Sequence, residues 1–236
     1  MTAPHVRLHL FFATENDRAV ILRQGPSKQC RMILWHRDTD TFKDGQWIKQ
    51  RIYLDRCDLS PDGQSFIYFT LSGYWSDESE GAYSVVSRPP YFTALSLFPE
   101  GSTWGDGGRF VDNKRFVATG RKDLIGRSKG LVWRERKEST KTNPTGLSRR
   151  DGKPASESDA QAVRVSAPVA QSPGVALDRY DTTAGKLYRR NGNDFEMIRD
   201  FAEMTFERVR SPYDCREESL ELEPSLWHPL ESEPQR

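Results

Sequence analysis

The residues best suited to chemistry lie close together in a short polar segment. His36 beside Asp38 pairs a base with a carboxylate, as general acid–base catalysis requires. Asp38, Asp40 and Asp44 offer oxygen ligands that suit calcium, but Phe42 takes a ligand position and no glutamate follows at the twelfth position. Aspartates are also frequent in tight turns. We therefore predict an Asp-rich hairpin turn over 38–45 and no metal site.

Templates of known catalytic sites find no match in this chain. It has four histidines and lacks the spacings G-x-S-x-G, H-E-x-x-H and C-x-x-C. The Gly-rich run 103–108 lacks the lysine of a phosphate-binding loop, so it predicts a flexible loop. We predict no cofactor and a binding protein more than an enzyme. The alternative is an enzyme acting on a sugar or nucleotide through Asp38, Asp77 or Asp106.

Four residues are the candidates for binding another protein. Tryptophan, tyrosine and arginine contribute most of the free energy at protein interfaces. Such residues occur in the expected loops and strand ends at Trp47, Arg88, Tyr91 and Trp104. We predict that these four side chains contact a partner protein.

The basic stretch 114–150 allows a different partner. It places Arg134, Arg136 and Lys137 next to Trp133, so phosphates could be bound while the ring stacks on a base. Acidic residues dilute the stretch, which favours a solvated loop. Nucleic-acid binding remains an alternative, as does a contact between this stretch and the acidic end of the chain.

The overall composition indicates a polar protein whose net charge creates no strong electrostatic field. Lysine and arginine total 35 against 34 acidic residues, which gives a net charge of +1 and no general attraction to nucleic acid or membranes. No apolar run reaches the length of a membrane span, and no secretory signal opens the sequence. The three cysteines are widely spaced and odd in number, as reduced thiols are. We expect a cytoplasmic protein.

The elements that must position these residues are strands. Val6, Leu8 and Leu10 alternate with polar residues, which predicts a strand with one buried face. Similar apolar runs between turn signals predict strands over 5–12, 18–23, 29–35, 46–54, 64–71, 83–86, 91–98, 109–119, 131–134, 185–190 and 195–198. The residue types at 25–27 and 191–194 predict hairpin turns. Residues 200–209 fit a short helix and a bent strand equally.

The segment 60–63, with the sequence S-P-D-G, predicts a tight turn. Pro61 presets its backbone angle, Asp62 can accept hydrogen bonds from nearby amides, and Gly63 tolerates a positive φ. The aromatic run that follows predicts a buried strand.

This turn resembles the S-P-D-G element of TolB-type β-propeller repeats, in which each blade carries such a turn before an inner strand. The chain also resembles a bacterial family that carries G-P-S, G-Q-W, S-P-D-G and R-P-P-Y in this order. Here these motifs are 25–27, 45–47, 60–63 and 88–91. The resemblance implies propeller-like blades and no particular activity.

Together these features predict an all-β protein, built either of propeller-like blades or of an antiparallel meander or sandwich. We expect a β-rich region at 1–134, a disordered insertion at 135–175, a hairpin region at 176–216 that completes the same domain, and an acidic flexible tail at 217–236. The predicted function is that of a non-catalytic protein-interaction or scaffolding module.

Overall fold

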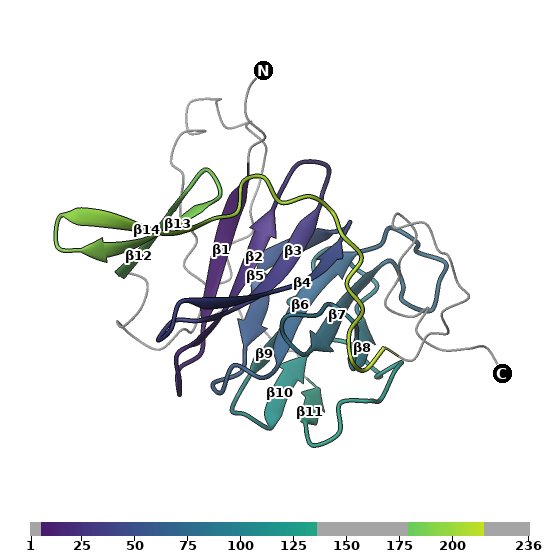
Figure 1. Cartoon of the computed structure of the whole chain (residues 1–236). Coiled ribbons are helices and arrows are strands. Elements are labelled where there is room, and N and C mark those ends of the chain that lie inside the picture. Colours follow the sequence, from purple (N-terminus) through teal and green to yellow (C-terminus); the bar gives the residue numbers. More distant parts are fainter. Residues whose placement is uncertain (1–5, 136–178, 215–236) are drawn as a thin grey trace, which may run out of the picture.

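The computed structural model describes residues 6–135 and 179–214, and they form an all-β protein (Figure 1). This confirms the predicted fold class. The reason lies in the sequence, where β-branched and aromatic residues occur in runs too short for helices and end at turn signals. Within the described ranges, no helix is long and apolar enough to cross a membrane.

The strands form four small sheets, each made of consecutive strands. Sheet A contains Arg7–Phe12 (β1), Arg18–Gln24 (β2), Cys30–His36 (β3) and Thr41–Ile48 (β4). Sheet B contains Arg51–Leu59 (β5), Phe66–Leu71 (β6), Ala82–Ser87 (β7) and Ser96–Pro99 (β8). Sheet C contains Gly108–Phe110 (β9), Arg115–Ala118 (β10) and Val132–Glu135 (β11). Sheet D contains Tyr180–Thr183 (β12), Lys186–Asn191 (β13) and Asp194–Asp200 (β14). All neighbouring strands are antiparallel except β10 and β11, which are parallel.

The sheets stack face to face in the order D, A, B, C, with a hydrophobic core in each of the three gaps. Val20 and Met32 of sheet A meet Tyr68 of sheet B in the largest core. Trp35 lies in the core between sheets A and D, and Phe98 in the core between sheets B and C. Among the described residues, sheets A and B are therefore covered on both faces, whereas sheets C and D are each covered on one face.

The first strands of the sheets lie along a shared edge. Strand β1 contacts both β5 and β12, and β5 contacts β9. Among the described residues, the four sheets do not close into a ring.

The turn at 60–63 forms as predicted and also joins three sheets. The Asp62 carboxylate accepts hydrogen bonds from Ser60 Oγ at 2.6 Å and Gln64 N at 3.0 Å, which fixes the turn. The Pro61 carbonyl accepts the amides of Thr14 and Glu15 from the β1–β2 connection. The Asp62 amide donates to Asn113 Oδ1 of the β9–β10 connection at 2.8 Å. This single turn thus links sheet B to sheets A and C.

Several predicted element boundaries are wrong. The turn predicted over 38–45 ends earlier, because β4 already begins at Thr41. The strand predicted over 46–54 breaks at Lys49 and Gln50, where the chain passes from sheet A to sheet B. The strand predicted over 109–119 is a hairpin of β9 and β10, since the Asp112 carboxylate accepts the amides of Lys114 and Arg115 in a turn.

Three further predictions about the chain are wrong. Residues 5–12 were expected to have one buried face, but sheet A is covered on both sides and Phe11 is buried on the face predicted to be polar. Only the end of 91–98 is a strand, because the amides of Phe92 and Thr93 donate to Gln46 Oε1 and not to a neighbouring strand. Residues 201–214 form neither helix nor strand.

Residues 201–214 cross the molecule as a strap, running from sheet D past sheet A to sheet B (Figure 1). Arg23 of β2 donates to the Phe201 carbonyl at 3.0 Å and the Ala202 carbonyl at 2.7 Å. At the other end, Tyr213 Oη donates to the Thr93 carbonyl at 3.1 Å. The insertion predicted at 135–175 and the tail predicted at 217–236 lie outside the described residues, apart from Glu135.

Candidate functional site

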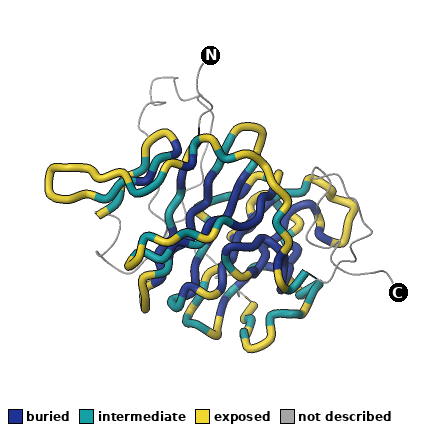
Figure 2. Tube along the Cα trace, viewed as in Figure 1, coloured by how far each residue is buried: buried dark blue, intermediate teal, exposed yellow. Residues whose placement is uncertain are grey.

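Two neighbouring loops at one end of sheet B carry the most exposed aromatic side chains. They are the β6–β7 connection at 72–81 and the β8–β9 connection at 100–107. The loops lie against each other, because a Cβ placed on Gly101 would come within 2.7 Å of Glu80 Oε2. Figure 2 shows mostly exposed residues along the β6–β7 connection. We call these two segments the aromatic loops.

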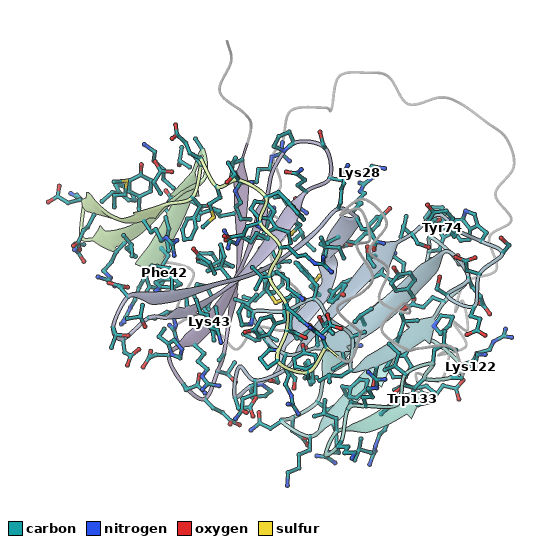
Figure 3. All side chains as sticks on the ribbon, turned by 45° about the vertical axis from the view of Figure 1, so that its right-hand side comes forward. Lys28, Phe42, Lys43, Tyr74, Lys122 and Trp133 are labelled. Carbon is teal, nitrogen blue, oxygen red and sulfur yellow. The ribbon has the colours of Figure 1, made fainter. Side chains whose placement is uncertain are left out.

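Three rings of the aromatic loops are largely open to solvent. Trp104 is 87% exposed, Tyr74 58% and Trp75 52%. Tyr74 projects from the rim of the molecule in Figure 3. The Trp75 ring rests on Gly81, where a Cβ would come within 2.6 Å of it and where φ is +72°. Gly81 therefore both closes the turn and makes room for the ring.

The backbone of the second loop is tied down near Trp104. Arg56 of β5 donates to the Thr103 carbonyl at 2.8 Å, and the Trp104 amide donates to Ser102 Oγ at 3.1 Å. An exposed ring on an anchored backbone loses little conformational entropy when a partner covers it. Trp104 thus has the properties of an interface anchor.

The charged residues of the aromatic loops are all acidic. The two segments contain no lysine or arginine. Four exposed carboxylates lie in the same two segments as the rings, from Asp77, Glu78, Glu80 and Asp106. Such a surface attracts cationic groups, which can also stack on the open rings.

Glu100 lies beneath the second loop and supports it. Its Oε1 accepts a hydrogen bond from Ser84 Oγ, and a Cβ on Gly105 would come within 1.8 Å of its Oε2. Burial raises the pKa of this carboxyl to about 7, while the hydrogen bond from Ser84 lowers it. The loop that presents Trp104 therefore packs on a carboxyl that titrates near neutral pH.

The structure separates the four predicted binding residues. Trp104 is exposed, as expected for a binding residue, whereas Trp47 is 8% exposed and Tyr91 9%. Trp47 packs against Phe206 of the strap, and Tyr91 packs edge-on against Tyr213 of the strap. The prediction that these two rings are available to a partner is wrong, because the chain itself covers them.

Arg88 is exposed but belongs to the anchor of the strap. Its guanidinium carbon lies 5.9 Å from the centre of the Tyr213 ring, and its amide donates to Tyr213 Oη at 3.1 Å. The strap thus contacts three of the predicted residues, Trp47 through Phe206 and both Arg88 and Tyr91 through Tyr213.

Sequence analysis missed Tyr74 and Trp75. The signal was present, because two adjacent aromatic residues occur in the segment S-G-Y-W-S-D-E-S-E-G, which is too polar for a buried strand. Large rings in such a segment are expected to lie at the surface.

The candidate catalytic residues lie at different places. His36 and Asp38 line an open depression of about 410 Å³ together with Arg18 and Asp62. Asp77 and Asp106 belong to the aromatic loops instead. The three carboxylates proposed for an enzyme site therefore do not converge.

Two of the aspartates considered for calcium bind arginines. Asp40 forms an ion pair with Arg189 at 2.7 Å, and Asp44 forms one with Arg199 at 2.6 Å. Both pairs join sheet A to sheet D. Over 6–135 and 179–214, no group of three or more His, Cys, Asp and Glu residues could hold a metal ion.

The part of the basic stretch that is described offers no ring for stacking on bases. Trp133 packs on Phe98 with ring centres 4.9 Å apart, and its Nε1 donates to the Ala118 carbonyl at 3.3 Å. Asp123 accepts the amides of Leu97 and Ile125, so it shapes the loop that precedes β11. Arg136 and Lys137 lie outside the described residues.

Comparisons with known proteins give no relative, since no protein-family model, curated protein or solved structure matches this chain. Any statement about function therefore rests on the geometry above.

Proposed function

We propose that the protein is a non-catalytic interaction or scaffolding module of propeller-like form that binds another protein through the aromatic loops. The exposure of Trp104, at 87%, is the observation that carries this proposal. A tryptophan held open on an anchored loop, next to two further exposed rings, is a surface that gains free energy when a partner removes it from water.

The four exposed carboxylates indicate the chemistry of the partner. A segment with lysine or arginine side chains would meet opposite charge at the rim and ring faces at the centre. A cytoplasmic location is part of the proposal, supported by Cys30 and Cys57, which are buried free thiols.

The test is affinity capture of the tagged protein from its native lysate, with and without nuclease, followed by mass spectrometry. We expect Trp104→Ala to reduce capture of a specific protein about tenfold or more, since interface tryptophans contribute about 2 kcal/mol or more. Its free energy of unfolding should change by less than about 0.5 kcal/mol. Phe195→Ala is the matched control, because Phe195 is also an exposed ring but lies on sheet D.

Other outcomes would reject the proposal. Equal capture by the Trp104→Ala and Phe195→Ala variants would mean that the aromatic loops are not the binding site. A large loss of stability in Trp104→Ala would mean that the ring is part of the core. Capture of nuclease-sensitive material alone would indicate nucleic acid.

A second candidate is an enzyme or receptor for a sugar or nucleotide at the depression beside His36. Its volume of about 410 Å³ falls within the range of small-molecule sites. Its lining is almost entirely polar, whereas such sites usually have apolar walls. Thermal shifts with hexoses and nucleoside monophosphates, abolished by His36→Ala, would favour this candidate over the protein-binding module.

A further inference from the structure

The face of sheet C that points away from sheet B has an unusual composition. Phe110, Phe116 and Trp133 point into the core between the two sheets. Because side chains alternate along a strand, their neighbours point outward. This outer face of sheet C consists of Arg109, Val111, Arg115, Val117, Val132 and Arg134.

Arginines and valines alternate across the strands of this face. Val117 is paired with Arg109 on one side and with Arg134 on the other, so an arginine–valine–arginine row spans about 10 Å, or two strand spacings. In the next row, Arg115 is paired with Val132. No residue of the face is acidic, and Arg109 and Arg134 make no ion pair with another described residue.

We propose that the chain's own acidic segment, residues 215–236, binds the outer face of sheet C. This segment has six glutamates and two arginines, and it also contains Leu220, Leu222, Leu226 and Trp227. Carboxylates with interspersed apolar residues complement a face on which arginines alternate with valines.

The strap delivers this segment close to sheet C. Tyr213 is anchored at the Thr93 carbonyl, and two residues further on the Leu95 carbonyl accepts the Arg127 amide at 2.7 Å. Arg127 belongs to the loop that leads into β11. In Figure 1 the end of the strap lies beside β8 and near β11. At about 3.3 Å per residue, the segment after Asp214 reaches up to roughly 70 Å, which is ample.

A nucleic acid suits the face less well. Its phosphates would pair with the arginines, but the valines between them would meet no complementary group. The nearby Trp133 ring, which could have stacked on a base, is engaged with Phe98. A peptide that is acidic and apolar satisfies both kinds of side chain.

The experiment is photocrosslinking in the full chain. Leu222 and Ser225 are replaced, in separate variants, by benzoylphenylalanine, and the adducts are mapped by mass spectrometry. We expect adducts within one chain to residues 109–117 and 132–134. Their yield should fall at least about threefold in about 0.5 M salt, because ion pairs at a surface are screened.

Variants of the face test the role of its arginines. Arg109→Gln combined with Arg134→Gln should lower the yield at least about threefold. Arg190→Gln should leave it unchanged, since Arg190 is an exposed arginine of sheet D. If the double variant is less stable, the proposal is tested instead by the effect of salt on the crosslinking yield of the protein with an unaltered face.

The proposal is overturned if the adducts map to other surfaces, if they join two chains, or if neither salt nor the arginine changes affect their yield. Binding of an oligothymidine that requires Arg109 and Arg134, without crosslinks to the face, would also overturn it and identify nucleic acid as the occupant. None of these outcomes depends on the aromatic loops, so the proposed function is tested separately.

Discussion

Two carboxyl groups of this protein have raised pKa values because they are buried. Glu100 lies under the loop that carries Trp104, and burial raises its pKa to about 7. Asp58 of β5 accepts the amides of Leu59 and Phe110, and burial raises its pKa to about 6. Asp58 thus joins β9 to β5 through a carboxyl whose pKa is raised by burial, whereas Glu100 joins the loop at 100–107 to Ser84 of β7.

Glu100 should make stability fall as pH rises. Its pKa is about 7 in the folded protein and about 4.5 in the unfolded chain, so the folded state binds more protons between these values. Its contribution is complete below pH 4.5 and is lost by about pH 7, with a total on the order of 3 kcal/mol. Urea unfolding at intervals from pH 4.5 to 8 measures this slope.

Glu100→Gln should flatten that slope and leave a smaller one from Asp58. Glu78→Gln, which alters an exposed carboxylate of the neighbouring loop, is the control and should keep the full slope. Identical pH profiles for the Glu100→Gln variant and the unaltered protein would contradict the role given to Glu100.

At the scale of elements, the strap is the part of the fold that could not be predicted from the sequence. It has no regular hydrogen-bonding pattern of its own, and its contacts join residues far apart in the chain. Arg31 of β3 pairs with Glu207 of the strap, and Tyr213 contacts Arg88 and Thr93 of the β7–β8 connection. The strap therefore links sheets D, A and B.

Tyr213→Phe should weaken this link while preserving the ring contacts. The variant removes the acceptor of the Arg88 amide and the donor to the Thr93 carbonyl, both at 3.1 Å. We expect a loss of about 1–2 kcal/mol in the free energy of unfolding, measured with urea. Tyr188→Phe is the control, because its hydroxyl makes no hydrogen bond to another described residue. Equal stability of the two variants would show that the strap end contributes little.

The elements that could be predicted from sequence are those fixed by local chemistry. The turns at 25–27, 60–63 and 191–194 were correct, because glycine, proline and asparagine determine the backbone within four residues.

Burial by a distant segment could not be predicted in this way. Trp47 is covered by Phe206, some 160 positions later in the sequence, and no feature near Trp47 indicates this. Gly45 is also in contact with a distant segment, since a Cβ there would come within 1.9 Å of the Pro90 carbonyl oxygen. A close approach between two segments becomes visible only in three dimensions.

For the whole molecule, the order of the stacked sheets determines which part unfolds locally at the lowest cost in free energy. Sheets A and B are covered on both faces, whereas sheet D meets only sheet A and its outer hairpin is exposed (Figure 2). Local opening free energies follow the amount of buried apolar surface. Amides of β2, β3, β6 and β7 should therefore exchange with solvent most slowly, and those of sheet D faster.

Leu187→Ala tests whether sheet D opens as a separate unit. Leu187 is fully buried between sheets D and A, so its truncation should cost about 2–4 kcal/mol. If sheet D opens independently, hydrogen exchange measured by mass spectrometry should accelerate in β12, β13 and β14 and stay nearly unchanged in β6 and β7. Met197→Ala, on the exposed face of the same sheet, should change exchange little. Equal acceleration in all four sheets would mean instead that the stack unfolds as one cooperative unit, with the strap coupling sheet D to sheets A and B.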